Sequence, residues 1–243
     1  GTGDNMVLML HGWGANLDLV LPLAKRLAQL NYRIYAPDLP GFGETAPPPV
    51  AWTVYDYAAW VLAYLDSQQI SGQVYLFGHS FGGRLSLILG ADHAERFRKI
   101  VLADSAGVRE PAPITSRLRL STYRAIRTGL RTVGLRPIAD HLQSWYSRRY
   151  GSSDYNAASG TMRETFVRVV NEDLLPYAAR VKPSTLLLWG DRDDDTPLHQ
   201  GKLLEQTIPD AGLVVFKGAG HYSYLERLDE SVRVIDYFFR QPG

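Results

Sequence analysis

The sequence predicts an α/β fold in which a mostly parallel central sheet is flanked by helices. Short apolar runs alternate with helical patterns over about the first hundred residues and again over about the last sixty. These runs are almost continuously hydrophobic, which is typical of parallel strands covered on both faces. One long stretch, residues 109–182, lacks the alternation.

Six apolar runs are expected to be strands: residues 6–10, 33–36, 74–77, 100–103, 185–189 and 213–216. Apolar residues recur at helical spacing over 17–28 and 54–65, which predicts amphipathic helices between the strands. Val232, Ile235 and Phe239 have the same period, so a helix is expected to close the chain against the sheet.

Residues 109–182 are predicted to form a helical cap folded over the sheet, so 1–108 and 183–243 constitute the core domain. This insertion has 13 Arg and Lys against 6 Asp and Glu, whereas the whole chain has a net charge of +1. Five of its arginines can gather on one helical surface: Arg117, Arg119, Arg124, Arg127 and Arg131. A solvated basic face is the simpler interpretation, and docking to an anionic lipid surface or an acidic partner is the alternative.

The composition excludes several classes of function. The near-neutral charge does not favour nucleic-acid binding, and the absence of Cys excludes disulfides, thiolate nucleophiles and cysteine-based metal sites. No apolar run approaches the ~20 residues that a membrane-spanning helix needs. The first residues lack the features of a signal peptide, which favours a cytoplasmic location.

A candidate nucleophile lies directly after the third expected strand. Residues 78–82 read Gly-His-Ser-Phe-Gly, a G-x-S-x-G motif, and the residues that follow can continue as a helix. In such a turn the serine is strained and its hydroxyl projects above the sheet, while the glycines relieve crowding. A helix cap is the simpler role for Ser80, but the strand and helix around the motif favour a nucleophile. His79 is expected to pack beside the turn.

Five motifs in this order resemble the α/β-hydrolase superfamily, specifically its capped, esterase-like members. They are HGWG at 11–14, DLPGFG at 38–43, GHSFGG at 78–83, WGDRD at 189–193 and GAGH at 218–221. The resemblance covers most of the chain outside the insertion. Members usually have two further strands before the first one here, so a sheet of six strands with an exposed edge is expected.

The resemblance implies a catalytic triad of Ser80, Asp193 and His221, in the chain order typical of this fold. His221 would accept the serine proton, and Asp193 would orient the imidazole. Asp104 is the main rival for the acid because it ends another predicted parallel strand. Asp191, Asp194 and Asp195 are expected to be solvated loop carboxylates instead.

Two backbone N–H groups are expected to form the oxyanion hole, those of Phe81 after the nucleophile and Trp13 in the first loop. Apolar side chains at the cap and around the elbow are expected to bind the substrate: Trp13, Phe81, Tyr123, Trp145 and Phe166. No cofactor is expected, because the glycines form no nucleotide-binding pattern. No metal site is expected either, since the Asp191–Asp195 cluster with His199 is better explained as a charged surface loop.

The predicted function is cleavage of small to medium apolar carboxylic esters through an acyl-enzyme on Ser80. A serine rather than an aspartate nucleophile argues against dehalogenases and epoxide hydrolases, which the resemblance would otherwise include. Carbon–carbon bond hydrolases, lactonases and acyl-carrier-protein methyl esterases remain open, because they share the triad. A hydrolase-fold ligand receptor with slow turnover is the alternative outside enzymes.

Overall fold

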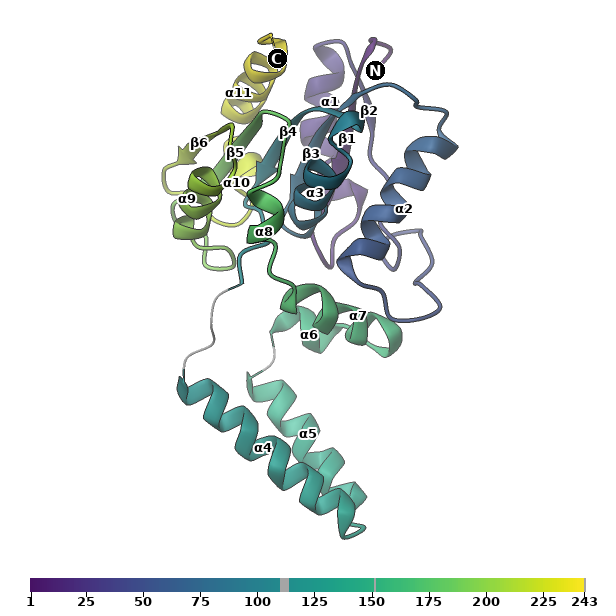
Figure 1. The fold of residues 1–243 in the computed structure, drawn as a ribbon, viewed down its shortest axis with the longest axis vertical. Helices are drawn as coiled ribbons and strands as arrows, with labels where there is room; N and C mark the ends of the chain where they lie inside the picture. Colours follow the sequence, from purple (N-terminus) through teal and green to yellow (C-terminus); the bar gives the residue numbers. More distant parts are fainter. Residues whose placement is uncertain (110–113, 151, 243) are drawn as a thin grey trace.

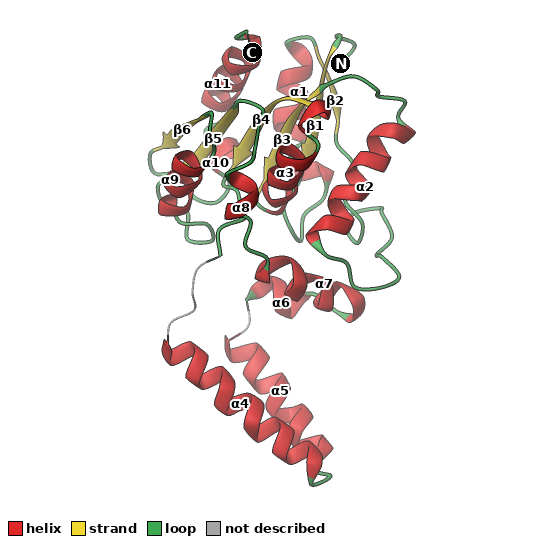
Figure 2. Ribbon diagram, in the orientation of Figure 1, coloured by secondary structure: helices red, strands yellow, loops and turns green. Residues whose placement is uncertain are grey.

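A computed structural model of the chain describes residues 1–109, 114–150 and 152–242, without the side chains of 116, 117 and 147. The predicted α/β architecture is confirmed: one sheet has the strand order β2-β1-β3-β4-β5-β6, and every neighbouring pair is parallel. The strands are β1 Asn5–Leu10, β2 Tyr32–Tyr35, β3 Val74–His79, β4 Phe97–Ala103, β5 Thr185–Gly190 and β6 Ala211–Phe216. Each overlaps a predicted strand, and Figure 2 shows the sheet within its helices.

Helices cover both faces of the sheet (Figure 1). One face packs against α2 Val54–Ser67, α3 Phe81–Asp92, α8 Leu175–Ala178 and α9 Leu198–Thr207, and the other against α1 Leu21–Gln29, α10 Ser223–Glu226 and α11 Leu228–Arg240. The same part of the chain also contains two short 3₁₀ helices, η1 Leu17–Leu19 and η2 Ala94–Arg96. Successive strand residues serve opposite faces: Leu8 and Leu10 join the α2–α3 layer, whereas Val7 and Met9 join the α1–α11 layer.

The strand and helix that flank the nucleophile motif, β3 and α3, lie buried at the centre of the fold. All residues of β3 are buried, and α3 is buried from Phe81 to Ala91. Apolar residues therefore occupy both alternating positions of β3, as expected for a strand covered on two sides. The strands at the two ends, β2 and β6, are edges, and both are partly exposed.

The described part of the predicted insertion contains helices joined by loops, namely α4 Ile114–Thr132, α5 Arg136–Tyr150, α6 Ser153–Ala157, α7 Gly160–Asn171 and then α8. The helix α7 lies against the core, because the buried Thr165 hydroxyl accepts the Trp52 N–H at 3.0 Å. The antiparallel pair α4 and α5 instead points away from the sheet (Figure 1). Only part of the insertion therefore covers the sheet, and the start predicted at 109 adjoins residues 110–113, outside the described residues.

Candidate active site

Ser80 forms the sharp turn between β3 and α3. Its backbone has φ 49° and ψ −106°, in the left-handed half of φ space that a side chain rarely adopts. The turn is held from β4: the Ser80 N–H donates to the carbonyl of Ala103 at 3.1 Å, and the Ser80 carbonyl accepts from the Ala106 N–H at 3.1 Å. These bonds keep a strained conformation in place. Because Ser80 directly follows β3, it lies at the carboxyl end of the central strands.

The glycines of the motif are required by close backbone contacts. A Cβ at Gly82 would meet the carbonyl oxygen of Leu10, and a Cβ at Gly78 would meet that of Gly82. The Gly82 N–H in turn donates to the His11 carbonyl at 3.1 Å. The turn is therefore packed directly onto the end of β1 and the loop that follows it.

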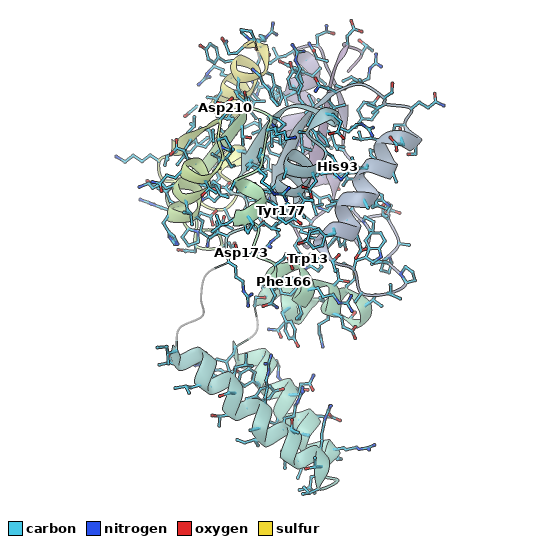
Figure 3. The ribbon with its side chains drawn as sticks, viewed as in Figure 1. Trp13, His93, Phe166, Asp173, Tyr177 and Asp210 are labelled. Carbon is cyan, nitrogen blue, oxygen red and sulfur yellow. The ribbon has the colours of Figure 1, made fainter. Side chains whose placement is uncertain are left out.

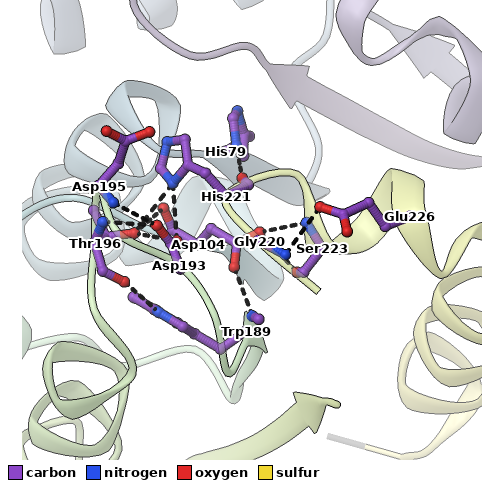
Figure 4. Close-up of polar contacts among 11 residues, drawn as sticks. His79, Asp104, Trp189, Asp193, Asp195, Thr196, Gly220, His221, Ser223 and Glu226 are labelled. Carbon is purple, nitrogen blue, oxygen red and sulfur yellow. Dashed lines mark hydrogen bonds and ion pairs between the residues drawn. The ribbon is translucent and has the colours of Figure 1, made fainter. Parts of the chain in front are cut away.

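His221 and Asp193 form a hydrogen-bonded pair (Figure 4). The His221 Nδ1–H donates to Asp193 Oδ2 at 2.9 Å, and the Asp193 side chain is fully buried. Asp193 Oδ1 accepts the backbone N–H groups of Asp195 and Thr196 at 2.9 Å each, and the Thr196 hydroxyl donates to Oδ2 at 2.7 Å. With Nδ1 carrying the proton, a neutral His221 keeps an unprotonated Nε2 for proton transfer.

The contact between Asp193 and His221 favours the ionised form of each side chain. Burial opposes ionisation of Asp193, but hydrogen bonds from His221 and Thr196 outweigh it and hold the pKa of Asp193 below its usual value. Burial likewise opposes protonation of His221, yet the hydrogen bond and charge of Asp193 raise the pKa of His221 above 6.5. The carboxylate therefore stabilises the imidazolium, as a triad acid must.

Asp104, the rival acid, bonds to different partners. One oxygen accepts the Gly190 N–H at 2.9 Å, and the other accepts the N–H and hydroxyl of Ser223 at 3.0 and 2.7 Å. No hydrogen bond joins it to the His221 ring among the described residues. Burial raises the pKa of Asp104 to about 7, although the bonds from Ser223 and Gly190 favour the carboxylate. The geometry thus favours Asp193 as the partner of His221.

His79 holds the backbone of the His221 loop. Its Nε2–H donates to the His221 carbonyl at 2.8 Å, and its ring lies 5.0 Å from that of His221. Burial, together with the nearby His221, lowers the pKa of His79 to about 3, so this ring is neutral near pH 7. Its buried Nδ1 has no hydrogen-bond partner among the described residues, and a Cβ added at Gly12 would come within 2.9 Å of it.

The predicted oxyanion donors come from the residue after Ser80 and from the loop after β1. Phe81 is the first residue of α3, so its N–H has no partner within the helix. The Trp13 N–H makes no hydrogen bond to any part of the chain that the structure describes. His11 fixes this loop: Nδ1–H donates to the Gly12 carbonyl at 2.8 Å, and Nε2 accepts the Leu39 N–H at 3.0 Å. Both donors therefore sit on rigidly held backbone.

A cavity of about 350 Å³ lies above the nucleophile and is lined by Ser80, His221, Trp13 and Phe81. Phe166 of α7 closes one side, and its ring lies 5.1 Å from that of Trp13 (Figure 3). The structure thus brings three of the five predicted substrate-binding residues together. No hydrogen bond joins Ser80 to His221 in the described part of the chain, and catalytic hydrogen bonds of this kind often tighten only when substrate binds.

The other two predicted substrate-binding residues lie elsewhere. Tyr123 of α4 stacks on Tyr146 of α5 at 4.0 Å between ring centroids, and Trp145 is half exposed on the same pair. Neither residue lines the cavity above Ser80. Aromatic residues on an amphipathic helix serve a helix–helix seam as well as a substrate pocket, so their pattern alone does not distinguish the two.

Three acidic and histidine side chains are close enough to hold a metal. Ligand atoms of Asp193, Asp195 and His221 lie within 4.8 Å of one another. Asp193 Oδ2 and His221 Nδ1 already bond to each other, which fits a triad pair better than two metal ligands. His199, the metal candidate of the sequence, is not part of this cluster.

Sequence reasoning missed the residues that hold the loops around the pair. Thr196 and Ser223 lie in no predicted motif, and their roles depend on contacts between distant segments. Asp38 was part of the DLPGFG motif, and its carboxylate accepts the Leu17 N–H at 2.7 Å and the Glu44 N–H at 2.9 Å. The carboxylate therefore joins the loops after β1 and β2.

A sheet of parallel strands with a serine turn after β3 and a histidine–carboxylate pair in the late loops defines the α/β-hydrolase architecture. The model of the alpha/beta hydrolase fold family matches residues 5–228. The chain belongs to this family.

Relatives within the family act on different bonds. The chain is similar to a 2-hydroxymuconate semialdehyde hydrolase of Pseudomonas putida, with 30% identity over 86% of this chain and 77% of that protein. It is also similar to Lipase 1 of Psychrobacter immobilis, with 25% identity over 93% of this chain and 74% of the lipase. A thermophilic esterase of Thermogutta terrifontis has the same fold, with a TM-score of 0.73 and 20% identity over 98% and 90% of the two chains.

Proposed function

We propose that this protein hydrolyses carboxylic esters of small to medium apolar substrates through an acyl-enzyme on Ser80. The observation that carries this proposal is the 2.9 Å hydrogen bond between His221 and a buried Asp193, at the cavity that Ser80 also lines. A serine hydroxyl needs such a base because it is a weak nucleophile at neutral pH.

The reaction proceeds in two halves. His221 Nε2 takes the Ser80 proton as the oxygen attacks the ester carbonyl, and the developing oxyanion accepts hydrogen bonds from the Phe81 and Trp13 N–H groups. His221 then protonates the leaving alcohol, which leaves an acyl group on Ser80. Water, deprotonated by His221, attacks the acyl carbonyl and releases the acid and the free serine.

The size and lining of the cavity support apolar substrates. Its volume of about 350 Å³ is near the lower end of small-molecule sites, which favours a short acyl or alcohol group. Trp13, Phe81, Phe166 and Val169 offer an apolar wall next to the nucleophile. An acyl chain packed against this wall would be shielded from water while the ester carbonyl reaches Ser80.

A second candidate function is cleavage of a carbon–carbon bond in an anionic substrate. Arg84 favours it, because this almost fully buried guanidinium lines the same cavity, and within the described part of the chain it donates a hydrogen bond to the Glu172 carbonyl, at 2.9 Å. Burial lowers the pKa of Arg84 to about 10, so it remains a cation near pH 7. Asp154 and Asp195 also line the cavity, and their negative charges oppose an anionic substrate.

The test measures steady-state hydrolysis of a p-nitrophenyl ester series by the parent protein, Ser80→Ala and Arg84→Gln, with folding checked by circular dichroism. We expect repeated turnover by the parent and a loss of ~10⁴-fold or more in Ser80→Ala. Arg84→Gln should leave neutral esters unaffected within a few-fold, because no neutral ester needs the guanidinium.

A 2-hydroxy-6-oxo-dienoate is assayed in parallel as the anionic substrate. Faster cleavage of this compound, with a KM that rises in Arg84→Gln and recovers in Arg84→Lys, would establish the second candidate instead. If a well-folded parent binds either compound but releases at most one product equivalent per Ser80, the ligand-receptor alternative replaces both.

A further inference from the structure

The helices α4 and α5 form a hairpin, residues 114–150, that has a strong excess of positive charge. This hairpin contains eight arginines and a single acidic residue, Asp140. The chain has a net charge of only +1, so the remainder is net negative. The charges are therefore separated between the hairpin and the rest of the protein, which orients the hairpin toward any negatively charged surface.

The tip of the hairpin is apolar and exposed. Val133 is 69% exposed and Ile138 53%, and Leu135 between them is also exposed. The turn places them outward: Gly134 has φ 82°, and the Leu135 N–H returns to the Leu130 carbonyl at 2.8 Å. A monomer gains nothing from apolar side chains projecting into water at a convex tip, so the tip fits a surface that accepts them.

Arginines surround this tip. Arg131 pairs with Asp140 at 2.9 Å, and Arg136 is exposed in the turn region itself. Further back, Arg119 lies over the Tyr150 ring at 4.0 Å, and Trp145 is half exposed. Exposed aliphatic side chains at the tip, and further back at Ile126, Leu118 and Ile114, alternate with arginines and aromatic rings, which is the mixture typical of helices at a bilayer interface. The side chain of Arg117 lies outside the described residues.

The direction of the hairpin allows this contact. It projects from the side of α6 and α7, at the opposite end of the molecule from α11 (Figure 1). No described helix is long and apolar enough to cross a membrane, so the contact would be peripheral. An acidic protein surface would pair with the arginines, whereas a bilayer interface accepts both the arginines, at its headgroups, and the aliphatic tip, among its acyl chains.

We infer that the α4–α5 hairpin docks the protein on an anionic lipid surface, with Val133, Leu135 and Ile138 inserted among the lipids and the arginines on the headgroups. This inference does not depend on the proposed ester hydrolysis, because lipid binding is measured without substrate. The hairpin would bind a surface that has both negative headgroups and an apolar interior.

Co-sedimentation with phosphatidylcholine vesicles, with and without phosphatidylglycerol, tests the inference. We expect the parent to bind the anionic vesicles at least ~10-fold more strongly than the neutral ones, and less strongly at high salt. Val133→Ser with Ile138→Ser should reduce that binding by ~10-fold, and Arg124→Gln with Arg136→Gln by a similar factor. Tyr237→Ser is the matched control, because Tyr237 is as exposed as Val133 but lies on α11, and it should bind like the parent.

These substitutions are all at exposed positions, and thermal melts verify that each variant folds. Absence of binding to anionic vesicles by the parent overturns the inference. So does a Val133→Ser and Ile138→Ser double variant that binds like the parent. Binding that depends only on the arginines and is displaced by poly-glutamate would indicate an acidic protein partner instead.

Discussion

The buried carboxylate of Asp104 accepts both the backbone N–H and the hydroxyl of Ser223, at 3.0 and 2.7 Å. Ser223 lies two residues after His221, and the other oxygen of Asp104 holds Gly190, three residues before Asp193. One side chain at the end of β4 therefore joins the two loops that carry the histidine and its acid. This arrangement separates orienting the imidazole, by Asp193, from fixing the loops, by Asp104.

The two aspartates should consequently differ when each is changed to asparagine. Asp193→Asn removes the charge that stabilises the imidazolium and favours the wrong tautomer, so kcat should fall by ~10⁴-fold. In Asp104→Asn the side-chain NH₂ group would face a donor in place of an acceptor, either the Gly190 N–H or the N–H and hydroxyl of Ser223. The free energy of unfolding should therefore fall by about 1–3 kcal/mol. Ester kinetics and urea unfolding measure the two effects. The reverse pattern would make Asp104 the triad acid.

The pH dependence of kcat/KM should have an acidic limb set by His221. Only the neutral imidazole accepts the Ser80 proton, so activity is lost as the pH falls through the pKa of His221. Asp193 raises that pKa, which places the limb above 6.5. Asp104 also contributes by its charge, so Asp104→Asn should move the limb to lower pH. An initial-rate profile measures both, and a parent limb well below 6.5 would contradict the His221–Asp193 pair.

Much of the site followed from local sequence, and the rest depended on contacts between distant segments. Ser80 could be predicted because the strand, the strained turn and its glycines are contiguous. His221 and Asp193 followed from a resemblance whose motifs also lie within short segments. Thr196 and Ser223 had no such signal, because each acts through partners brought together by the sheet. The strand order places those partners at one edge only after folding.

The direction of the insertion was also beyond local reasoning. The sequence predicts a helical cap for residues 109–182, but helical spacing does not say which surface each apolar stripe meets. In the structure Tyr123 meets Tyr146 across the hairpin, while Phe166 from the next part of the insertion reaches Trp13. From the sequence alone, Tyr123 and Phe166 were both expected to bind the substrate.

The close packing of the serine turn predicts a sharp contrast between two glycines. Gly82→Ala places a methyl group on the Leu10 carbonyl, so it should lower the free energy of unfolding by about 2 kcal/mol or more and displace the turn. Gly72→Ala has no atom within 4 Å of the new methyl group and should change stability by less than ~1 kcal/mol. Urea unfolding with ester assays compares them. Equal stability and full activity in both variants would show that the turn tolerates a side chain.

Substrate length should respond to Phe166 and not to Trp145. Phe166 borders the cavity against Trp13, so Phe166→Ala enlarges it and should raise the ratio of kcat/KM for long over short acyl esters by ~10-fold. Because truncating a buried Phe typically costs about 3 kcal/mol or more, Phe166→Leu serves as a milder variant with the same expected direction. Trp145→Ala should leave the ratio unchanged, since this residue is half exposed and does not line the cavity. A shift in Trp145→Ala equal to that in Phe166→Ala would mean that α5 reaches the substrate during turnover, as the sequence alone predicted.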